Sequence, residues 1–416
     1  MQAIKPPDAA ELEDPGEILA IISDPARRGT LYPDLHRLRE VEPRFHTDAL
    51  TGSPAWLLTR HADVQTVLRH RAARSDHRGV EIFDQGPEGR VFYEMQLNTL
   101  LFLPPDRHDR VRSLISKAFT PRSVEQRLPR IQQVVDTLLD AVEDRGEMDL
   151  VADFAYPLPM VVICEMLGVP AEDLPRFQRW AHDSHRRGEL GLISDAVIAR
   201  GEEATRGFQE YFRGLIEDHR KHPRDDLMSA LLAAEDGGER LSDEDLVGSC
   251  YILLQAGHGT TADLIAMSVN ALLENPEQEA RLRDAPEGIP VAVEEFLRFD
   301  TSVQISQRVA DEAMTIGGQV IPPGEVCVLF NGAANRDPEV FASPDQLDVA
   351  RTPNPHLTFG MGYHTCLGAS LARLEIQTAL RTLLARFPKL KFSGARGAYR
   401  SNLFLRGLSE LPLRFS

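Results

Sequence analysis

Apolar residues recur every three or four positions along most of the chain, which is the spacing of amphipathic helices. This pattern predicts helices over residues 32–41, 61–70, 106–118, 121–145, 156–167, 170–183, 193–220, 225–235, 242–275, 277–286 and 288–299. Another helix is expected after Leu367, where apolar residues fall at positions 371, 374, 376, 380, 383, 384 and 387. The chain is therefore predicted to be mainly α-helical.

The few strand signals are short and lie outside these helical stretches. They predict strands around Trp56 and over 313–320, 324–330 and 389–392, and a hairpin over 403–414 that turns near Gly407. Helical spacing breaks up over 75–97, where Gly79, Gly86, Pro87 and Gly89 cluster. This segment is predicted to be a long irregular loop, which is uncommon in a compact domain unless it serves a function. Residues 1–15 are polar and acidic and are expected to form a loose N-terminal arm.

Composition excludes several classes of protein. The 416 residues include 46 basic and 63 acidic side chains, and a net charge of -17 argues against nucleic-acid binding. Cysteines 164, 250, 327 and 366 are far apart and form no C-x-x-C pair, which argues against a disulfide framework and a structural zinc site and fits a reducing cytoplasm. With no secretory signal pattern and no run near 18 apolar residues, we expect a cytoplasmic protein with no membrane segment.

The most specific chemistry lies near the C-terminus, in the stretch Phe359-Gly360-Met361-Gly362-Tyr363-His364-Thr365-Cys366-Leu367-Gly368. Cys366 precedes a predicted helix, where the dipole and free backbone amides favour a thiolate. Gly360 and Gly362 allow the loop to pass close to a flat cofactor, and Gly368 removes one more side chain from the approach. A cysteine standing alone would instead be inert core.

This stretch resembles the haem-ligand loop of the cytochrome P450 family, Phe-Gly-x-Gly-x-His-x-Cys-x-Gly, at all six fixed positions. The resemblance implies that Cys366 is the axial thiolate of haem b, with Phe359, Gly360 and Gly368 against the cofactor; such a ligand favours O–O cleavage. It also implies one roughly triangular, mainly α domain over 16–416, with small peripheral β-sheets. In lacking a membrane helix, the sequence resembles the soluble bacterial branch of the family.

The predicted helix 242–275 contains Ala256-Gly257-His258-Gly259-Thr260-Thr261 in its middle. Two glycines inside a helix cost about 1 kcal/mol each relative to alanine. They indicate either close packing against another helix or close approach of a cofactor with a local kink. The hydroxyl of Thr260 is expected to bond the Ala256 carbonyl one turn back.

This segment resembles the family's oxygen-binding groove, Ala-Gly-x-(Asp/Glu)-Thr. The resemblance gives Thr260 the hydrogen bond to the bound oxygen, and Ala256 and Gly257 the space for it. Gly259 departs from the pattern, because the family has a proton-relaying acid there. We hypothesise that water fills the vacated space and carries the proton to Thr260, with Asp263 as a candidate helper; the alternative for Asp263 is a solvated or ion-paired residue.

Glu295 and Arg298 share one helix face and resemble the family's Glu-x-x-Arg motif. The implied role is a buried charge pair, joined by a third partner in the segment before the cysteine loop. Each of four cations would singly be typical of the surface, but together they match the family's register and imply binding of the haem propionates. They are His108, Arg112, Arg308 and His364.

The resemblance implies a haem-thiolate monooxygenase that inserts one atom of O₂ into a C–H or C=C bond. No G-x-G-x-x-G follows a strand, so the electrons are expected from a ferredoxin with its reductase or from a flavodoxin, with Arg110 or Arg112 meeting the donor. The alternatives, raised by Gly259, are peroxide-driven oxidation and nitric oxide reduction; a non-catalytic haem sensor would need an output domain.

A small or medium, largely apolar substrate is expected, with one polar handle near Gln304. The pocket would include a mobile loop over 78–101 and residues near 178–195. The candidate lining residues, for which plain core is the equal alternative, are Phe92, Leu97, Leu100, Leu253, Ala256, Val303, Gln304 and Phe404.

Overall fold

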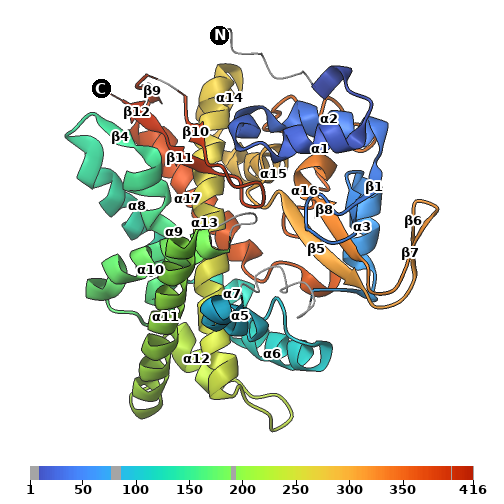
Figure 1. Cartoon of the computed structure of the whole chain (residues 1–416). Coiled ribbons are helices and arrows are strands. Elements are labelled where there is room, and N and C mark those ends of the chain that lie inside the picture. The colour runs from blue at the N-terminus through green and yellow to red at the C-terminus, as the bar shows by residue number, and fades with distance from the viewer. Residues whose placement is uncertain (1–8, 76–85, 189–193, 395, 416) are drawn as a thin grey trace.

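The computed structural model describes residues 9–75, 86–188, 194–394 and 396–415. Figure 1 shows a helix-rich part on the left and a part with the largest sheet on the right, with helix α13 (Asp243–Glu274) running between them. This helix begins with a capping box, in which Ser242 and Asp245 bond each other's backbone amides. Almost every residue from 261 to 272 of α13 is buried, so the helix is the axis of the main core.

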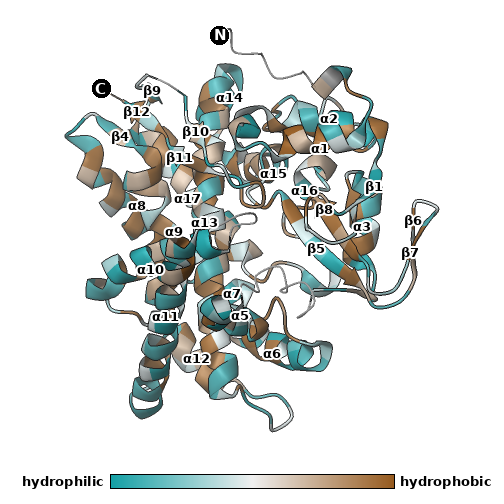
Figure 2. Cartoon of the chain, in the orientation of Figure 1, coloured by the Kyte–Doolittle hydropathy of each residue, from teal (hydrophilic) through white to brown (hydrophobic). Residues whose placement is uncertain are grey.

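The other helices surround this axis, and α9, α11, α15 and α17 pack directly against it. Figure 2 shows hydrophobic and hydrophilic residues interleaved along outer helices such as α11, as expected for elements with one buried face. The helices are α1 (Pro15–Ser23), α2 (Leu31–Val41), α3 (His61–Arg69), α5 (Arg90–Leu97), α6 (Pro105–Ala118), α7 (Pro121–Glu125), α8 (Leu128–Glu143), α9 (Pro157–Met166), α10 (Leu174–Arg187), α11 (Asp195–Lys221), α12 (Leu227–Ala233), α14 (Pro276–Asp284), α15 (Ile289–Phe299), α16 (Asn331–Ala334) and α17 (Ala369–Arg386).

The largest sheet has five strands in the order β1-β2-β8-β5-β3. Strands β2 and β8 are parallel, and the other neighbours are antiparallel. Helices α1 and α2 pack on one face of this sheet, and α3 packs on the other. The strands are β1 (Arg44–Thr47), β2 (Ala55–Leu58), β3 (Ala73–Arg74), β4 (Glu147–Asp149), β5 (Ile305–Ala310), β6 (Met314–Ile316), β7 (Gln319–Ile321), β8 (Val326–Phe330), β9 (Lys391–Phe392), β10 (Ala398–Tyr399), β11 (Leu408–Glu410) and β12 (Pro412–Arg414).

The predicted mainly α architecture with small sheets is confirmed, but one predicted loop is in part a helix. Residues 76–85 of that loop lie outside the described residues, and residues 90–97 form α5. The carboxylate of Glu202 on α11 accepts hydrogen bonds from the backbone amides of Val91 and Phe92, each at 2.9 Å. This cap comes from more than a hundred residues along the chain, so local sequence gives no sign of it.

The prediction of a C-terminal hairpin over 403–414 is wrong. Strand β11 pairs with β10, and β12 pairs with β4 and β9, because the open sheet edges of distant segments take both strands. The segment 313–320 is two strands, β6 and β7, which turn at Gly317 and Gly318 with φ of 55° and 86°. Of the expected N-terminal arm, residues 1–8 lie outside the described residues, while Ala9 is buried and Leu12 packs against the α1–α2 core.

Candidate active site

Cys366 lies just before α17, whose N-cap is Gly368, as the sequence predicts. Its backbone amide donates to the Phe359 carbonyl at 2.8 Å, and the backbone amides of Gly368 and Ala369 face its sulfur. The thiol has accessible surface, yet burial raises its pKa, against the amides, Arg112 and Arg373, which lower it. A thiol that is accessible and still desolvated faces an enclosed space. The predicted preference for a thiolate is therefore not met by the helix end alone, and a coordinated metal ion would supply it.

Four cations predicted from the sequence converge beside this thiol. His364 lies two residues before Cys366, and burial lowers its pKa to about 2, reinforced by the charges of Arg308, His108 and Arg112. The His108 ring lies 4.8 Å from the His364 ring, measured between centroids. Arg112, one turn after His108 on α6, donates to the Thr365 carbonyl at 2.6 Å. Arg308 is buried in the middle of β5.

In this cation cluster, His108, Arg112, Arg308 and His364, only His108 has a carboxylate nearby, with Nδ1 3.5 Å from Asp109; among the described residues no carboxylate pairs with either arginine. Arg308 donates only to the carbonyl of Gln307, and burial lowers its pKa to about 10. Nε2 of His108 and Nε2 of His364 are buried and have no hydrogen-bond partner. Buried cations and orphaned nitrogens of this kind need anionic acceptors. The cluster therefore fits a group with carboxylates, such as the two propionates of haem b.

The groove in α13 is open beside buried neighbours. The Thr260 hydroxyl donates to the Ala256 carbonyl at 2.7 Å, as predicted, and Ala256 is exposed in the middle of the helix. A Cβ on Gly257 would meet nothing within 4 Å, and the same holds for Gly368 near Cys366. These open positions form a cradle in which a flat cofactor has room.

The two glycines of the groove lack a side chain for different structural reasons. Gly257 faces open space, as expected for approach of a cofactor, whereas a Cβ on Gly259 would lie 2.9 Å from Cε1 of His185 on α10. The hypothesis that water fills the space at Gly259 is therefore corrected, because a side chain occupies it. Gly362 is likewise explained by packing: its φ is 65°, and a Cβ there would lie 2.8 Å from the Leu68 carbonyl oxygen.

The other polar residues of this helix face the core. Asp263 is buried and ion-paired to Arg400 at 2.5 Å; burial raises the pKa of Asp263 to about 7 although Arg400 lowers it. His258 is buried edge-on to Tyr156, with ring centroids 4.1 Å apart.

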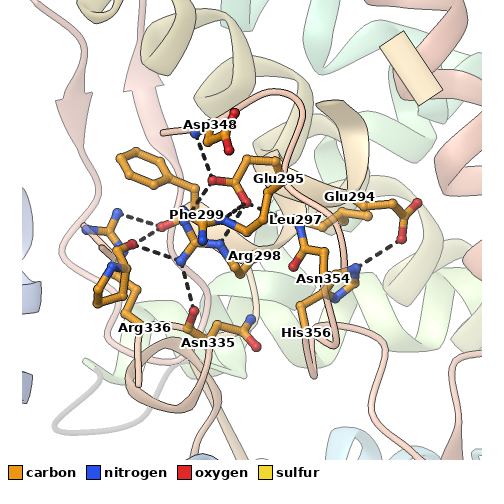
Figure 3. A network of polar contacts seen from close by, with 12 residues as sticks. Glu294, Glu295, Leu297, Arg298, Phe299, Asn335, Arg336, Asp348, Asn354 and His356 are labelled. Atoms are coloured by element: carbon orange, nitrogen blue, oxygen red, sulfur yellow. Dashed lines mark hydrogen bonds and ion pairs between the residues drawn. The ribbon is translucent and has the colours of Figure 1, made fainter. Parts of the chain in front are cut away.

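Glu295 and Arg298 form a fully buried pair with two bonds of 2.8 Å (Figure 3). The expected third partner from the segment before the cysteine loop is Arg351, whose Nε lies 3.0 Å from Glu295. The backbone amide of Asp348 and the side-chain amide of Asn354 also donate to Glu295. Arg298 bonds the carbonyls of Asn335 and Pro344 in turn, so α15 is tied to the loop that leads to Cys366.

The candidate pocket residues differ in whether their side chains are accessible to a substrate. Leu97, Leu100, Leu253, Val303 and Phe404 are partly accessible, whereas Phe92 is buried and packs under Arg187. Gln304 is a poor polar handle, because its amide nitrogen donates to Tyr32 and to the Thr301 carbonyl and its side chain lies against Gly332.

Sequence reasoning missed two residues near the site, Arg74 and His185, and one buried acid on α17, Glu375. The charge of Arg74 also lowers the pKa of His364, and the guanidinium lies over the Tyr363 ring. Glu375 on α17 is buried, with one oxygen unpartnered and a pKa that burial raises far above its usual value. His185 fills the groove beside Gly259. Of these three residues, only Glu375 could have been noticed in the sequence, because it lies on the apolar face of the last predicted helix.

The comparisons with known proteins agree with this geometry. The family model described as Cytochrome P450 matches residues 44–287 and 289–395. Cytochrome P450 CYP107DY1 of Priestia megaterium is 42% identical over 385 residues, covering 90% of this chain and 93% of the relative. Mycinamicin IV hydroxylase/epoxidase of Micromonospora griseorubida is 40% identical over 394 residues, covering 92% and 95%. The crystal structure of P450BioI in complex with hexadec-9Z-enoic acid ligated acyl carrier protein has a TM-score of 0.89 at 36% identity, covering 95% of this chain and all of that one.

The fold and the site thus define a haem-binding oxidoreductase with a mainly α architecture. The chain belongs to the cytochrome P450 family, is a monooxygenase and takes haem b as its cofactor. Across the described residues, no helix is long and apolar enough to cross a membrane.

Proposed function

We propose that Cys366 is the axial ligand of haem b, that the cation cluster binds its propionates, and that the enzyme hydroxylates or epoxidises a small or medium, largely apolar substrate. The observation that carries the proposal is the position of the accessible Cys366 thiol beside Arg112 and Arg308, which have no carboxylate partner in the described residues. When bound, haem supplies the activation of O₂. The relative named Mycinamicin IV hydroxylase/epoxidase supports this class of reaction.

The chain's own residues would then act around the cofactor. The amides of Gly368 and Ala369, together with Arg112 and Arg373, favour negative charge on the Cys366 sulfur. Gly257 leaves the face of α13 open, and the Thr260 hydroxyl holds a proton at the groove, where it now donates to the Ala256 carbonyl. The apolar side chains of Leu253, Val303 and Phe404 would exclude water from the substrate.

The electron donor is proposed to be a ferredoxin with its reductase, or a flavodoxin. The two arginines that could contact the donor, Arg110 and Arg112, differ in their present contacts. Arg110 is engaged by Asp245 at 2.9 Å, whereas Arg112 is held against the Thr365 carbonyl near the cysteine loop. Because Arg112 is also proposed to bind a propionate, the rates are compared at equal haem content. Slower reduction of the bound haem in Arg112→Gln than in Arg110→Gln would then support this docking site; equal rates in both variants and the wild type would exclude it.

Steady-state turnover with isotopically labelled O₂, with peroxide and with nitric oxide tests the reaction. Incorporation of one labelled oxygen atom per product molecule, with electrons from the donor, supports the monooxygenase. The second candidate is peroxide-driven oxidation, favoured by the absence of an acid at Gly259. Product that forms rapidly with peroxide but not with O₂ and donor would select it. Substrates would first be found by a shift of the haem Soret band.

A further inference from the structure

Helices α10 and α13 meet where a histidine takes the volume of a missing side chain. A Cβ built on Gly259 would lie 2.9 Å from Cε1, 3.3 Å from Nε2 and 3.6 Å from Nδ1 of His185. The ring therefore fills the space that any side chain at position 259 would enter. An acid at position 259 and His185 in this position exclude each other.

One ring nitrogen of His185 is hydrogen-bonded, and the other has no hydrogen-bond partner among the described residues. Nε2 of His185 lies 3.0 Å from the carbonyl oxygen of Gln255 on α13. Because a carbonyl only accepts, the proton of the neutral ring is assigned to Nε2, and Nδ1 carries the lone pair. No group in the described part of the chain hydrogen-bonds Nδ1, and His185 as a residue is only partly buried. Nδ1 can therefore exchange a proton with water.

The groups around His185 keep it neutral near pH 7. Burial lowers its pKa to about 4, the Gln255 carbonyl opposes this, and the charges of Arg400 and of His182 on the same helix lower the pKa further. From α13, His258 faces it with ring centroids 6.0 Å apart. An imidazole with a low pKa does not retain a proton, so once protonated it is a strong donor.

We propose that His185 is the proton-handling residue of the oxygen-binding groove and replaces the acid that Gly259 excludes. The inference rests on the proposed function. A proton from solvent is taken up at Nδ1 and passed, directly or across one water, to the hydroxyl oxygen of Thr260, the residue that follows Gly259. The hydroxyl proton of Thr260 moves on into the groove, while Nε2–H stays on Gln255. In each cycle one proton enters from solvent at Nδ1 and one proton leaves the Thr260 hydroxyl into the groove. The imidazole ring is neither oxidised nor reduced.

The test compares His185→Gln with His182→Gln. Glutamine at 185 keeps an amide that can donate to Gln255 but has no titrating nitrogen, and His182 is exposed one turn earlier on α10. We expect His185→Gln to lower product formed per NADH by about tenfold, at the low end of what general acids contribute. Peroxide release should rise while KM and the carbon monoxide spectrum stay unchanged. His182→Gln removes only the smallest of the influences that lower the pKa of His185, so its product per NADH should remain within about twofold of wild type.

The pH profile separates proton handling from a packing role. In the wild type, product per NADH should rise from about pH 8 to about pH 6, since the protonated fraction of His185 grows tenfold per unit. The His185→Gln profile should be flat. If His185→Gln keeps more than half of the coupling, or keeps the wild-type slope, the proposal is wrong. A wild type without the thiolate spectrum or without turnover would instead overturn the proposed function.

Thermal unfolding tests the geometry without any turnover. Gly259→Ala should lower the melting temperature in the wild-type background, because its Cβ meets the His185 ring. In a His185→Ala background the same change should not lower it, and the double variant His185→Ala with Gly259→Glu should regain coupling that His185→Ala lacks. Equal effects of Gly259→Ala in both backgrounds, or no recovery by the double variant, would overturn the proposal.

Discussion

Two buried clusters of charge lie in this molecule and are built in opposite ways. In the first cluster, Glu295 and Arg298 are fully buried, and each polar atom of the Glu295 carboxylate has at least two donors. In the second, Arg308 is buried near Cys366 with no carboxylate partner among the described residues, and beside it the neutral ring of His364 has a buried Nε2 without a hydrogen-bond partner.

This difference between the two clusters indicates that one serves the stability of the fold and the other serves cofactor binding. A satisfied buried pair adds little by itself but cannot lose one partner without leaving an uncompensated charge. An unsatisfied cluster of cations destabilises the chain until an anion from outside enters. The first cluster therefore holds the loop before Cys366 in place, and we propose that the second is completed by the cofactor.

The largest effect is expected from Glu295→Gln. The substitution keeps the shape but removes the negative charge between Arg298 and Arg351. Urea unfolding should show a loss of about 3–5 kcal/mol, in both the haem-free and the haem-loaded protein. A loss below about 1 kcal/mol, the value typical of a surface ion pair, would contradict the role given to this cluster.

Arg308→Met should separate the two clusters by the sign of its effect. Removing a buried charge without a partner should leave the haem-free protein as stable as before or more stable. Haem affinity should fall by about 10–100-fold, since a hydrogen bond to a charged group contributes about 1.5–3 kcal/mol. The matched control is Arg336→Met, which removes a buried arginine bonded to Asp345 and the Phe299 carbonyl. It should cost stability and leave haem affinity unchanged; the reverse pattern would refute the comparison.

Gly257→Ala probes the open cradle in the same way. Its Cβ meets no atom within 4 Å, so the haem-free protein should gain about 1 kcal/mol from the better helix propensity of alanine. The haem-loaded protein should gain less, measured as the difference between unfolding free energies with and without haem. Gly248→Ala is the control, because a Cβ there would run into the Asn98 carbonyl and should destabilise both forms. An equal gain with and without haem would show that nothing approaches Gly257.

The smallest effect is expected at Glu294, which borders the first cluster. Burial raises its pKa, but hydrogen bonds from Arg373 and His356 outweigh burial and hold the pKa at about 2. The folded state therefore binds this proton less tightly than the unfolded chain, so the stabilisation is present above about pH 4.3 and is lost as the pH falls to about 2. Because the pair is about one third exposed, Glu294→Gln should cost only about 0.5 kcal/mol at pH 7. A cost that persists at low pH would mean that packing, not charge, is responsible.

The sequence predicted what short stretches of chain determine. The placement of Cys366 at a helix start and the bond from Thr260 to Ala256 depend on neighbours within one turn, and both were foreseen. Helix α5 was missed because its cap, Glu202, is distant in sequence. The residue that fills the gap at Gly259 belongs to another helix, so no local pattern shows it. Strands β11 and β12 were paired wrongly because their partners lie elsewhere in the chain.

The most direct measurement is the absorption spectrum of the reduced protein with carbon monoxide, for the wild type and for Cys366→His. The account predicts the red-shifted Soret band of thiolate ligation in the wild type. In Cys366→His, haem should still bind through the cation cluster, but the red shift should be lost, while Cys250→Ser should retain it. A wild type without the red shift, or a Cys366→His protein that keeps it, would contradict the assignment of Cys366 as the ligand.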